Sequence, residues 1–323
     1  MIRRRQLLHK LAPLPRLLGQ LSWPPFTPDL PLATLKQRYE LPTSRYLRIH
    51  GLDVHVAVHE PPAEAHAERP AEAPTLVLIH GLMASLHAWD GWVRELGDSF
   101  RIVRLDLPGF GLTGPHPEAA YDAESLVGFL DAVRAALHIP KMVLAGSSLG
   151  GFVSWLYALR HRERVEKLIL IDPVAYPQEL LPFIALLAAP GSERFGLTIN
   201  PRRSVALGMR DVFGDPRKVS AEALRRCQDL ALRPGNRAAL IAVCRHIHRL
   251  HVENPYEAEI RNLAVPTLLM WGTADRWIPP SHVDSWQRDV QGLVVKLYDG
   301  VGHVPMEEAP VETARDAKEF LQH

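Results

Sequence analysis

The stretch Lys141-Met-Val-Leu-Ala-Gly-Ser-Ser-Leu-Gly-Gly151, followed by Phe152-Val-Ser-Trp-Leu-Tyr-Ala-Leu159, decides the fold. The apolar run predicts a strand, the small residues predict a sharp turn, and the second segment predicts a helix. Within the turn, Ser148 has glycine two positions before it and two positions after it. Small residues there let strand and helix pass close together, and the turn holds the serine above the sheet edge. Ser148 is therefore the candidate nucleophile, whereas Ser147 lacks such glycines.

Length and composition set the class of protein. The chain has 323 residues, enough for one large α/β domain or a domain with an insertion. Its content of 47% apolar and 23% charged residues is ordinary for a globular protein, and its net charge is +1. We expect no nucleic-acid partner, because no global positive field exists. No apolar run reaches about 18 residues, so we expect no spanning helix and a cytoplasmic protein. Cys227 and Cys244 are expected to be reduced and buried.

Residues 1–43 form an unusual N-terminal arm. Five basic residues precede the first acidic residue, Asp29, and leucines recur at helical spacing between Leu7 and Leu21. Charges interrupt every apolar run and no small-residue cleavage site follows, so a signal peptide is not expected. Two interpretations stay open. The leucines pack on the domain, or residues 1–23 make peripheral contact with a membrane surface.

The rest of the chain alternates between strand and helix patterns. Strands are expected at residues 46–49, 54–58, 75–79, 102–106, 141–146, 167–171, 265–270 and 294–298. Helices are expected at residues 86–96, 123–137, 152–161, 281–290 and 310–321. The first two strands form a hairpin around His50-Gly51, and alternation places His55 and His59 on its exposed face. The pattern predicts an α/β fold with a mostly parallel eight-stranded sheet and helices on both faces.

The alternation stops between Asp172 and Val265, which are 265 − 172 = 93 residues apart. Helices are expected there at residues 180–188, 204–212, 221–232 and 237–250. We interpret residues 174–260 as an inserted helical cap, and residues 44–173 with 261–323 as the core. Candidate substrate-binding residues in the cap are Phe183, Leu187 and Met209. A metal site at the three cap histidines His246, His248 and His251 is not expected, because residues two apart on a helix point away from each other.

A serine hydroxyl needs a base within hydrogen-bond reach, and that base needs an orienting carboxylate. Ser148, Asp275 and His303 each follow an expected strand, so the three can converge at one edge of a parallel sheet. Asp172 and Asp299 are rival carboxylates, but Asp275 fits the order along the chain better. The candidate oxyanion donors are the backbone N–H groups of Leu149 and of Leu82, which follows His80-Gly81. His80 is expected to hold that loop.

Several motifs together resemble the α/β-hydrolase superfamily in its branch with a helical cap. They are His80-Gly81, Asp106-Leu-Pro-Gly-Phe-Gly111, Gly146-Ser-Ser-Leu-Gly150, Trp271-Gly-Thr-Ala-Asp275 and Gly302-His303. The chain is similar to bacterial esterases, monoacylglycerol-type lipases and hydrolases of meta-cleavage products over about residues 45–322. The resemblance implies Ser148 as nucleophile, His303 as base and Asp275 as its partner, with no metal and no organic cofactor. Dehalogenases and epoxide hydrolases differ, because their nucleophile is aspartate.

The expected function is hydrolysis of a hydrophobic carboxylic ester, as in a serine esterase or lipase, through an acyl-enzyme. The expected partner is this small-molecule ester. Two alternatives stay open. One is a carbon–carbon bond hydrolase of meta-cleavage-type diketones with the same triad. The other is a hydrolase-like ligand-binding protein with little turnover, against which a complete triad with both oxyanion donors argues.

Overall fold

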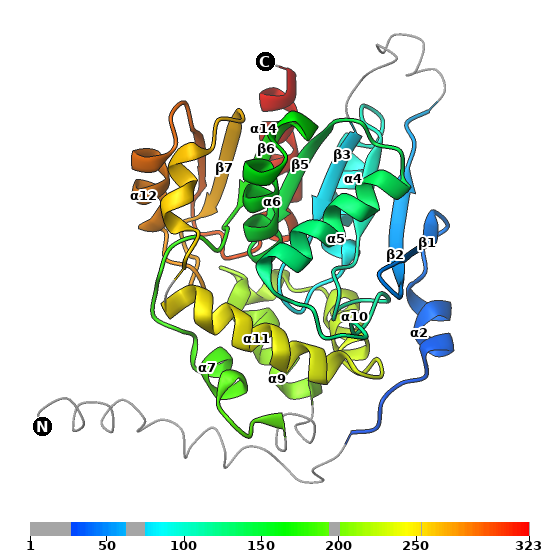
Figure 1. Cartoon of the computed structure of the whole chain (residues 1–323). Coiled ribbons are helices and arrows are strands. Elements are labelled where there is room, and N and C mark those ends of the chain that lie inside the picture. Colours follow the sequence, from blue (N-terminus) through cyan, green and yellow to red (C-terminus); the bar gives the residue numbers. More distant parts are fainter. Residues whose placement is uncertain (1–26, 63–74, 194–200, 253, 323) are drawn as a thin grey trace, which may run out of the picture.

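A computed structural model describes residues 27–62, 75–193, 201–252 and 254–322 (Figure 1). Within them lies one sheet of eight strands in the order β1-β2-β4-β3-β5-β6-β7-β8. The strands are β1 (Ser44–Ile49), β2 (Leu52–His59), β3 (Thr75–Ile79), β4 (Ile102–Leu105), β5 (Met142–Ser147), β6 (Val165–Ile171), β7 (Thr267–Gly272) and β8 (Val294–Tyr298). The β1–β2 and β2–β4 pairs are antiparallel and the other pairs are parallel. The expected mostly parallel sheet of eight strands is confirmed.

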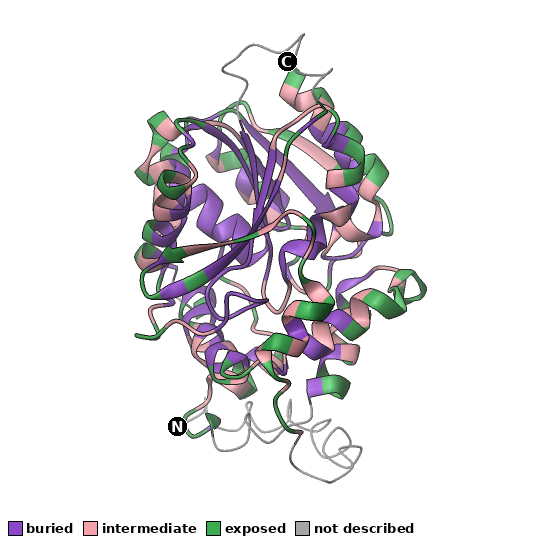
Figure 2. Cartoon of the chain, turned by 90° about the vertical axis from the view of Figure 1, so that its right-hand side faces the viewer, coloured by how far each residue is buried: buried purple, intermediate pink, exposed green. Residues whose placement is uncertain are grey.

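Helices cover both faces of the sheet, which explains why its central strands read as continuous apolar runs. In Figure 1, α5 (Ala123–Ala136) and α6 (Leu149–Arg160) lie on one face, and α4 (Asp90–Leu96) and α14 (Pro310–Gln322) on the other. Every residue of β3 and β5 is buried, as the purple strands of Figure 2 show. Smaller elements are α12 (His282–Asp289), α13 (Pro305–Glu308), η1 (Leu86–Trp89), η2 (Arg162–Arg164), η3 (Pro216–Lys218) and η4 (Glu257–Asn262).

The β1–β2 hairpin turns through His50 and Gly51, whose φ angles of 47° and 77° suit a two-residue hairpin loop. The expectation that His55 is exposed on this hairpin is wrong. Its side chain is fully buried. The loop after β4 lies against it, since Asp106 bonds its ring and Thr113 Oγ1 accepts a hydrogen bond from its backbone N–H. The Nδ1 atom of His55 lies 2.7 Å from Asp106 Oδ2, and its Nε2 atom lies 2.7 Å from Ser44 Oγ.

Among the described residues, four α-helices stand between β6 and β7, close to where the sequence predicts them. They are α7 (Pro182–Ala188), α9 (Pro201–Val212), α10 (Ala221–Leu230) and α11 (Asn236–Val252). Figure 1 shows them gathered at one end of the sheet. Ser220 caps α10 by accepting a hydrogen bond from the Ala223 N–H at 3.0 Å. These helices cover the sheet edge from which Ser148, Asp275 and His303 emerge.

The N-terminal region is described only from residue 27, so the basic leucine-rich segment of residues 1–23 lies outside the described residues. Helix α2 (Leu32–Tyr39) packs through buried Leu35 against Leu112 of the core and Leu230 of α10. Among the described residues, every helix is too short or too polar to cross a membrane. Cys227 is half-buried and Cys244 is buried, and both are free thiols.

Candidate active site

Ser148 stands on a strained turn between β5 and α6. Its φ of 53° and ψ of −115° lie where residues with a side chain are rarely found. The turn is possible because two glycines flank it. A Cβ atom on Gly150 would collide with the Ile79 carbonyl oxygen, and one on Gly146 would collide with the Gly150 carbonyl oxygen. The Ser148 N–H donates to the Ile171 carbonyl at 2.9 Å, which ties the turn to β6.

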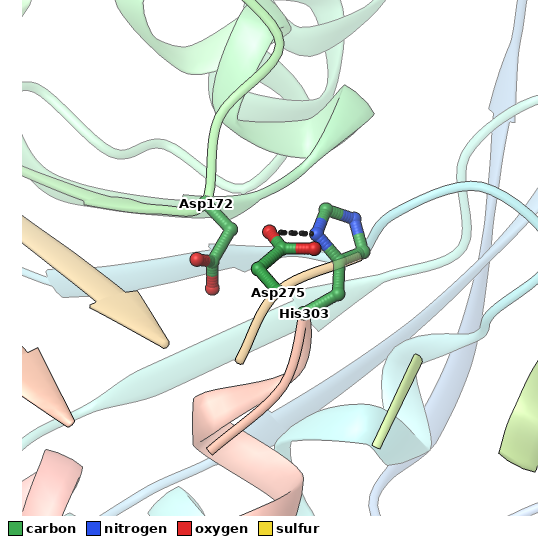
Figure 3. Close-up of side chains that lie close together, drawn as sticks. All are labelled: Asp172, Asp275 and His303. Atoms are coloured by element: carbon green, nitrogen blue, oxygen red, sulfur yellow. Dashed lines mark hydrogen bonds and ion pairs between the residues drawn. The ribbon is translucent and has the colours of Figure 1, made fainter. Parts of the chain in front are cut away.

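His303 and Asp275 form a buried pair, drawn in Figure 3. The Nδ1 atom of His303 lies 2.7 Å from Asp275 Oδ2. The other oxygen of Asp275 accepts hydrogen bonds from the N–H groups of Trp277 at 2.7 Å and Ile278 at 3.1 Å, which fixes the carboxylate. A carboxylate facing Nδ1 keeps the proton on that nitrogen. The Nε2 atom of His303 is therefore free to act as a base, and it has no hydrogen-bond partner among the described residues.

Ser148 and His303 line one cavity of about 60 Å³. Asp275 lies behind the imidazole ring and does not line it. Trp277 forms another part of the wall and stacks on His303, with ring centroids 5.6 Å apart and an interplanar angle of 25°. The structure thus brings together the serine, the histidine and the aspartate that the sequence singles out. The Ser148 hydroxyl and His303 Nε2 share the cavity without a hydrogen bond to each other.

The candidate oxyanion donors lie on either side of Ser148. Leu82 lines the cavity, and Leu149 is the first residue of α6, where backbone N–H groups are free of helical partners. A Cβ atom on Gly81 would lie 3.1 Å from the Cβ atom of Ser148, so the loop needs a glycine to come this close. His80 holds the loop, since it accepts from the Leu107 N–H at 3.0 Å and donates to the Gly81 carbonyl at 2.7 Å. Burial lowers the pKa of His80 and keeps its ring neutral.

Glu308 fixes the loop that carries His303, and sequence reasoning missed it. Its buried carboxylate accepts hydrogen bonds, each 2.8 Å long, from the N–H groups of Gly302, Gly214 and Asp215. The N–H of His303 itself donates to the Val212 carbonyl at 2.7 Å. The end of α9 and the turn after it therefore hold the histidine loop. In the sequence, Glu308 is one of two adjacent glutamates in a short helix, and nothing marks which one turns inward.

The helices between β6 and β7 supply another part of the cavity wall. Met209 lines the cavity, as the sequence suggests, together with three more residues of α9 and Cys227 of α10. Phe183 and Leu187 lie outside the lining. Phe183 packs instead on Trp277, with ring centroids 5.5 Å apart, and so contacts a residue of the wall. The helical pattern predicts which residues face inward, but how the helices pack on the body decides which of them reach the cavity.

One acidic side chain in the wall was also missed. Glu307 lines the cavity, and burial raises its pKa to about 7, with the charge of Arg226 opposing the shift and that of Asp90 adding to it. The other lining residues are apolar or carry small polar groups, apart from His303, and among the described residues no lysine or arginine lines the cavity. The cavity therefore suits an uncharged, largely apolar group.

A second carboxyl group, Asp172, lies beside Asp275, as Figure 3 shows. One side-chain ligand atom from each of Asp172, Asp275 and His303 lies within 4.8 Å of the other two. These residue types can bind metals, but the Nδ1 atom of His303 is already engaged with Asp275, and neither aspartate lines the cavity. A metal at this point would face the back of the imidazole ring rather than a substrate.

The chain is similar to known hydrolases. Residues 74–197 match a family model described as the alpha/beta hydrolase fold. Over 267 residues the chain is 26% identical to epoxide hydrolase 3 of Xenopus tropicalis, covering 77% of this chain and 71% of that protein. It is 29% identical to 2-hydroxymuconate semialdehyde hydrolase of Pseudomonas sp. (strain CF600), covering 63% and 71%. The crystal structure of a membrane phospholipase A, described as a bacterial virulence factor, is 26% identical, with a TM-score of 0.71 and coverage of 99% and 98%.

Proposed function

Because the chain belongs to the α/β-hydrolase superfamily and is a hydrolase, we propose that it cleaves a hydrophobic carboxylic ester through an acyl-enzyme on Ser148. One observation carries this proposal. A serine in strained backbone and a histidine with a free Nε2 atom line the same cavity, and the histidine's other nitrogen is held by a buried aspartate.

The reaction follows from these positions. His303 Nε2 takes the proton of the Ser148 hydroxyl as the oxygen attacks the ester carbonyl carbon. The negative oxygen that develops is stabilised by the N–H groups of Leu82 and Leu149. As the intermediate collapses, the imidazolium gives its proton to the alcohol oxygen, and the acyl group stays on Ser148. Water, activated by the same Nε2 atom, then releases the acid. Asp275 keeps the ring in the required tautomer throughout.

The choice of ester hydrolysis also depends on which residue type stands at the nucleophile position. Dehalogenases and epoxide hydrolases of this superfamily use an aspartate as the nucleophile, and Ser148 occupies that position here. We therefore propose ester hydrolysis rather than epoxide opening, although an epoxide hydrolase is among the similar proteins.

The acyl part of the substrate is expected to be short to medium in length. A cavity of about 60 Å³ holds on the order of four water-sized groups, at roughly 10–15 Å³ for each. Each methylene buried there contributes about 0.8 kcal/mol, close to fourfold in kcat/KM. We propose that residues 174–260 act as the cap that limits this length, with Met209 in the wall.

A carbon–carbon bond hydrolase is the second candidate, favoured by the similarity to 2-hydroxymuconate semialdehyde hydrolase. The charge of the cavity argues against it. The diketone substrates of such enzymes carry a carboxylate, which no lysine or arginine among the described lining residues would balance, and Glu307 would repel it once ionised.

A panel of p-nitrophenyl esters, from acetate upward in chain length, tests the two candidates beside a meta-cleavage diketone acid. We expect kcat/KM to rise with chain length until the cavity is filled and then to fall, with no measurable cleavage of the diketone. A flat profile together with fast diketone cleavage would overturn the ester proposal and leave the triad in place.

A lipid ester at a membrane surface is a specific form of this proposal. The likeness to a membrane phospholipase A extends over 99% of this chain, and residues 1–23 combine basic residues with regularly spaced leucines. The full-length protein should sediment with vesicles that contain anionic phospholipid at low salt, and a truncation lacking residues 1–23 should stay in solution. Equal sedimentation of the two forms would contradict membrane contact by the arm. It would support the other interpretation, in which the arm packs on the domain of a cytoplasmic enzyme.

A further inference from the structure

Asp172 is a buried carboxyl group beside the proposed triad. It directly follows β6, its φ is 43°, and its side chain is inaccessible to solvent. One of its oxygens, Oδ1, accepts a hydrogen bond from the Gly272 N–H at 3.1 Å. Among the described residues, no lysine or arginine forms an ion pair with it. The charged group that acts on it is Asp275, which has the same sign.

The second oxygen of Asp172, Oδ2, has no hydrogen-bond donor among the described residues. A buried carboxylate oxygen without a donor carries a large desolvation cost, so such a group is expected to bind a proton. A proton turns the oxygen into a donor, and the neighbouring carboxylate of Asp275 is an acceptor (Figure 3). The surrounding groups favour the same state, because burial and the charge of Asp275 raise the pKa of Asp172 well above its usual range.

We propose that Asp172 is a neutral carboxylic acid at neutral pH and donates its proton in a hydrogen bond to Asp275, so that the two carboxyl groups share one proton behind His303. Asp172 is then a positioning residue that acts on His303 through Asp275. The inference rests on the proposed triad for its kinetic consequence, whereas the protonation state itself can be measured without turnover.

The consequence concerns the charge that His303 experiences. If Asp172 were ionised, two negative charges would lie behind the imidazole and would stabilise its protonated form, which cannot act as a base. A neutral Asp172 leaves one charge there, on Asp275. Another titratable group near Asp275 is His282, whose pKa is lowered by burial against the charge of Asp275, so it stays uncharged at neutral pH.

The test is the pH dependence of kcat/KM for a p-nitrophenyl ester, measured on the wild type and on two variants. Asp172→Asn keeps an N–H donor toward Asp275 and an oxygen for the Gly272 N–H. We expect it to retain activity within about threefold and to leave the acidic limb of the profile in place. Asp172→Ala removes the donor, so the full charge of Asp275 faces His303, and the acidic limb should move to higher pH.

An ionised Asp172 gives the opposite pattern. Asp172→Asn would then remove a charge, and the acidic limb would move to lower pH by about one to two pH units. That result would overturn the proposal, whereas a solely structural role would lower activity without moving the limb.

Infrared spectroscopy of the resting enzyme gives a readout that does not depend on catalysis. At pH 7 Glu307, whose pKa is raised to about 7, contributes a carbonyl band of its own. The wild type should show a further carbonyl band from the buried Asp172 carboxyl group, and the spectrum of Asp172→Asn should lack that further band. Identical spectra would contradict the inference even in an active enzyme. If instead Ser148→Ala keeps full turnover, the proposed function fails while the infrared result stands, so the two failures can be told apart.

Discussion

Two Ser–His–Asp arrangements with a buried histidine and a buried aspartate can be compared among the described residues, and one of them, at Ser148 and His303, lines the cavity. His55 joins Asp106 and Ser44 through its two ring nitrogens, each at 2.7 Å. His303 joins Asp275, also at 2.7 Å, and lies beside Ser148 in the cavity wall. The distance between imidazole and carboxylate therefore does not distinguish a structural pair from a candidate catalytic one.

The two arrangements differ in whether the histidine nitrogens and the serine hydroxyl are already hydrogen-bonded. In the first, both nitrogens of His55 are engaged, and Ser44 already accepts from the Leu41 N–H at 2.8 Å on a strand with ordinary backbone angles. In the second, the Nε2 atom of His303 is free and Ser148 stands on a strained turn. A reactive arrangement is marked by its unpaired nitrogen, its strained serine and its cavity.

The largest expected difference between the two arrangements lies in turnover. Ser148→Ala should lower kcat by about five to six orders of magnitude, since the nucleophile is removed. Ser44→Ala should stay within about threefold of the wild type, because its hydroxyl bonds His55 and the Leu41 N–H and does not line the cavity. Ester hydrolysis by both purified variants checks this, with circular dichroism to confirm folding. Comparable losses of kcat in the two variants would contradict the assignment of Ser148 as catalytic and Ser44 as structural.

The next largest expected effect is the loss of kcat when a carboxylate near His303 is replaced. Asp275→Asn should lower kcat by up to about four orders of magnitude, because the tautomer of His303 is no longer fixed. Asp172→Asn should cost far less, since the Nδ1 atom of His303 is hydrogen-bonded to Asp275 and not to Asp172. Steady-state kinetics of the two variants decides the assignment, and a larger loss in Asp172→Asn would transfer the role of the triad acid to that residue.

The Asp106 pair should matter for stability rather than turnover. Burial opposes ionisation of Asp106, yet its interactions with His55, His80 and the Leu86 N–H lower its pKa to about 2. Because the folded pKa lies below the unfolded value of 3.8, the stabilisation is complete above about pH 4 and is lost as the pH falls toward 2. It amounts to about 2 kcal/mol. Urea unfolding at pH 7 should show Asp106→Ala destabilised by about 3–5 kcal/mol, and an unchanged midpoint would contradict a buried structural pair.

A second expected effect on stability concerns Asp172 and has the opposite sign. Its folded pKa is raised above the unfolded value, so folding holds an extra proton and stability declines as the pH rises through the interval between the two values. Asp172→Asn removes this penalty, which amounts to about 1.4 kcal/mol for each pH unit of the interval. The variant should be more stable than the wild type at pH 8 and not at pH 4, as measured by urea unfolding. A gain of the same size at both pH values would point to packing instead.

Sequence patterns predicted the fold, and they singled out the three residues of the proposed triad, because both depend on local signals. Apolar runs, turn glycines and helix periodicity are properties of short segments, and the loops after parallel strands meet at one sheet edge whatever lies between them. The turn at Ser148 is specified by its glycines alone. For the same reason Asp275 and His303 could be placed together although 28 residues separate them.

The features that the sequence did not predict depend on packing between distant segments. Strand alternation predicted that His55 is exposed, because alternation carries no information on the loop after β4 that lies against His55. The inward turn of Glu308 is set by the backbone amides of residues 214–215, far away in the chain. Likewise the proximity of Asp172 to Asp275 follows from the pairing of β6 with β7 and from the turn after β7, neither of which a linear pattern measures.

The central claim is that Ser148 is the acylated nucleophile, and peptide mapping of a fluorophosphonate adduct tests it most directly. The wild type should carry one adduct, on Ser148, with Ser147 and Ser44 unmodified, and Asp275→Asn should label far more slowly. An adduct on Ser44 or Ser147, or undiminished labelling of Ser148→Ala, would contradict the claim.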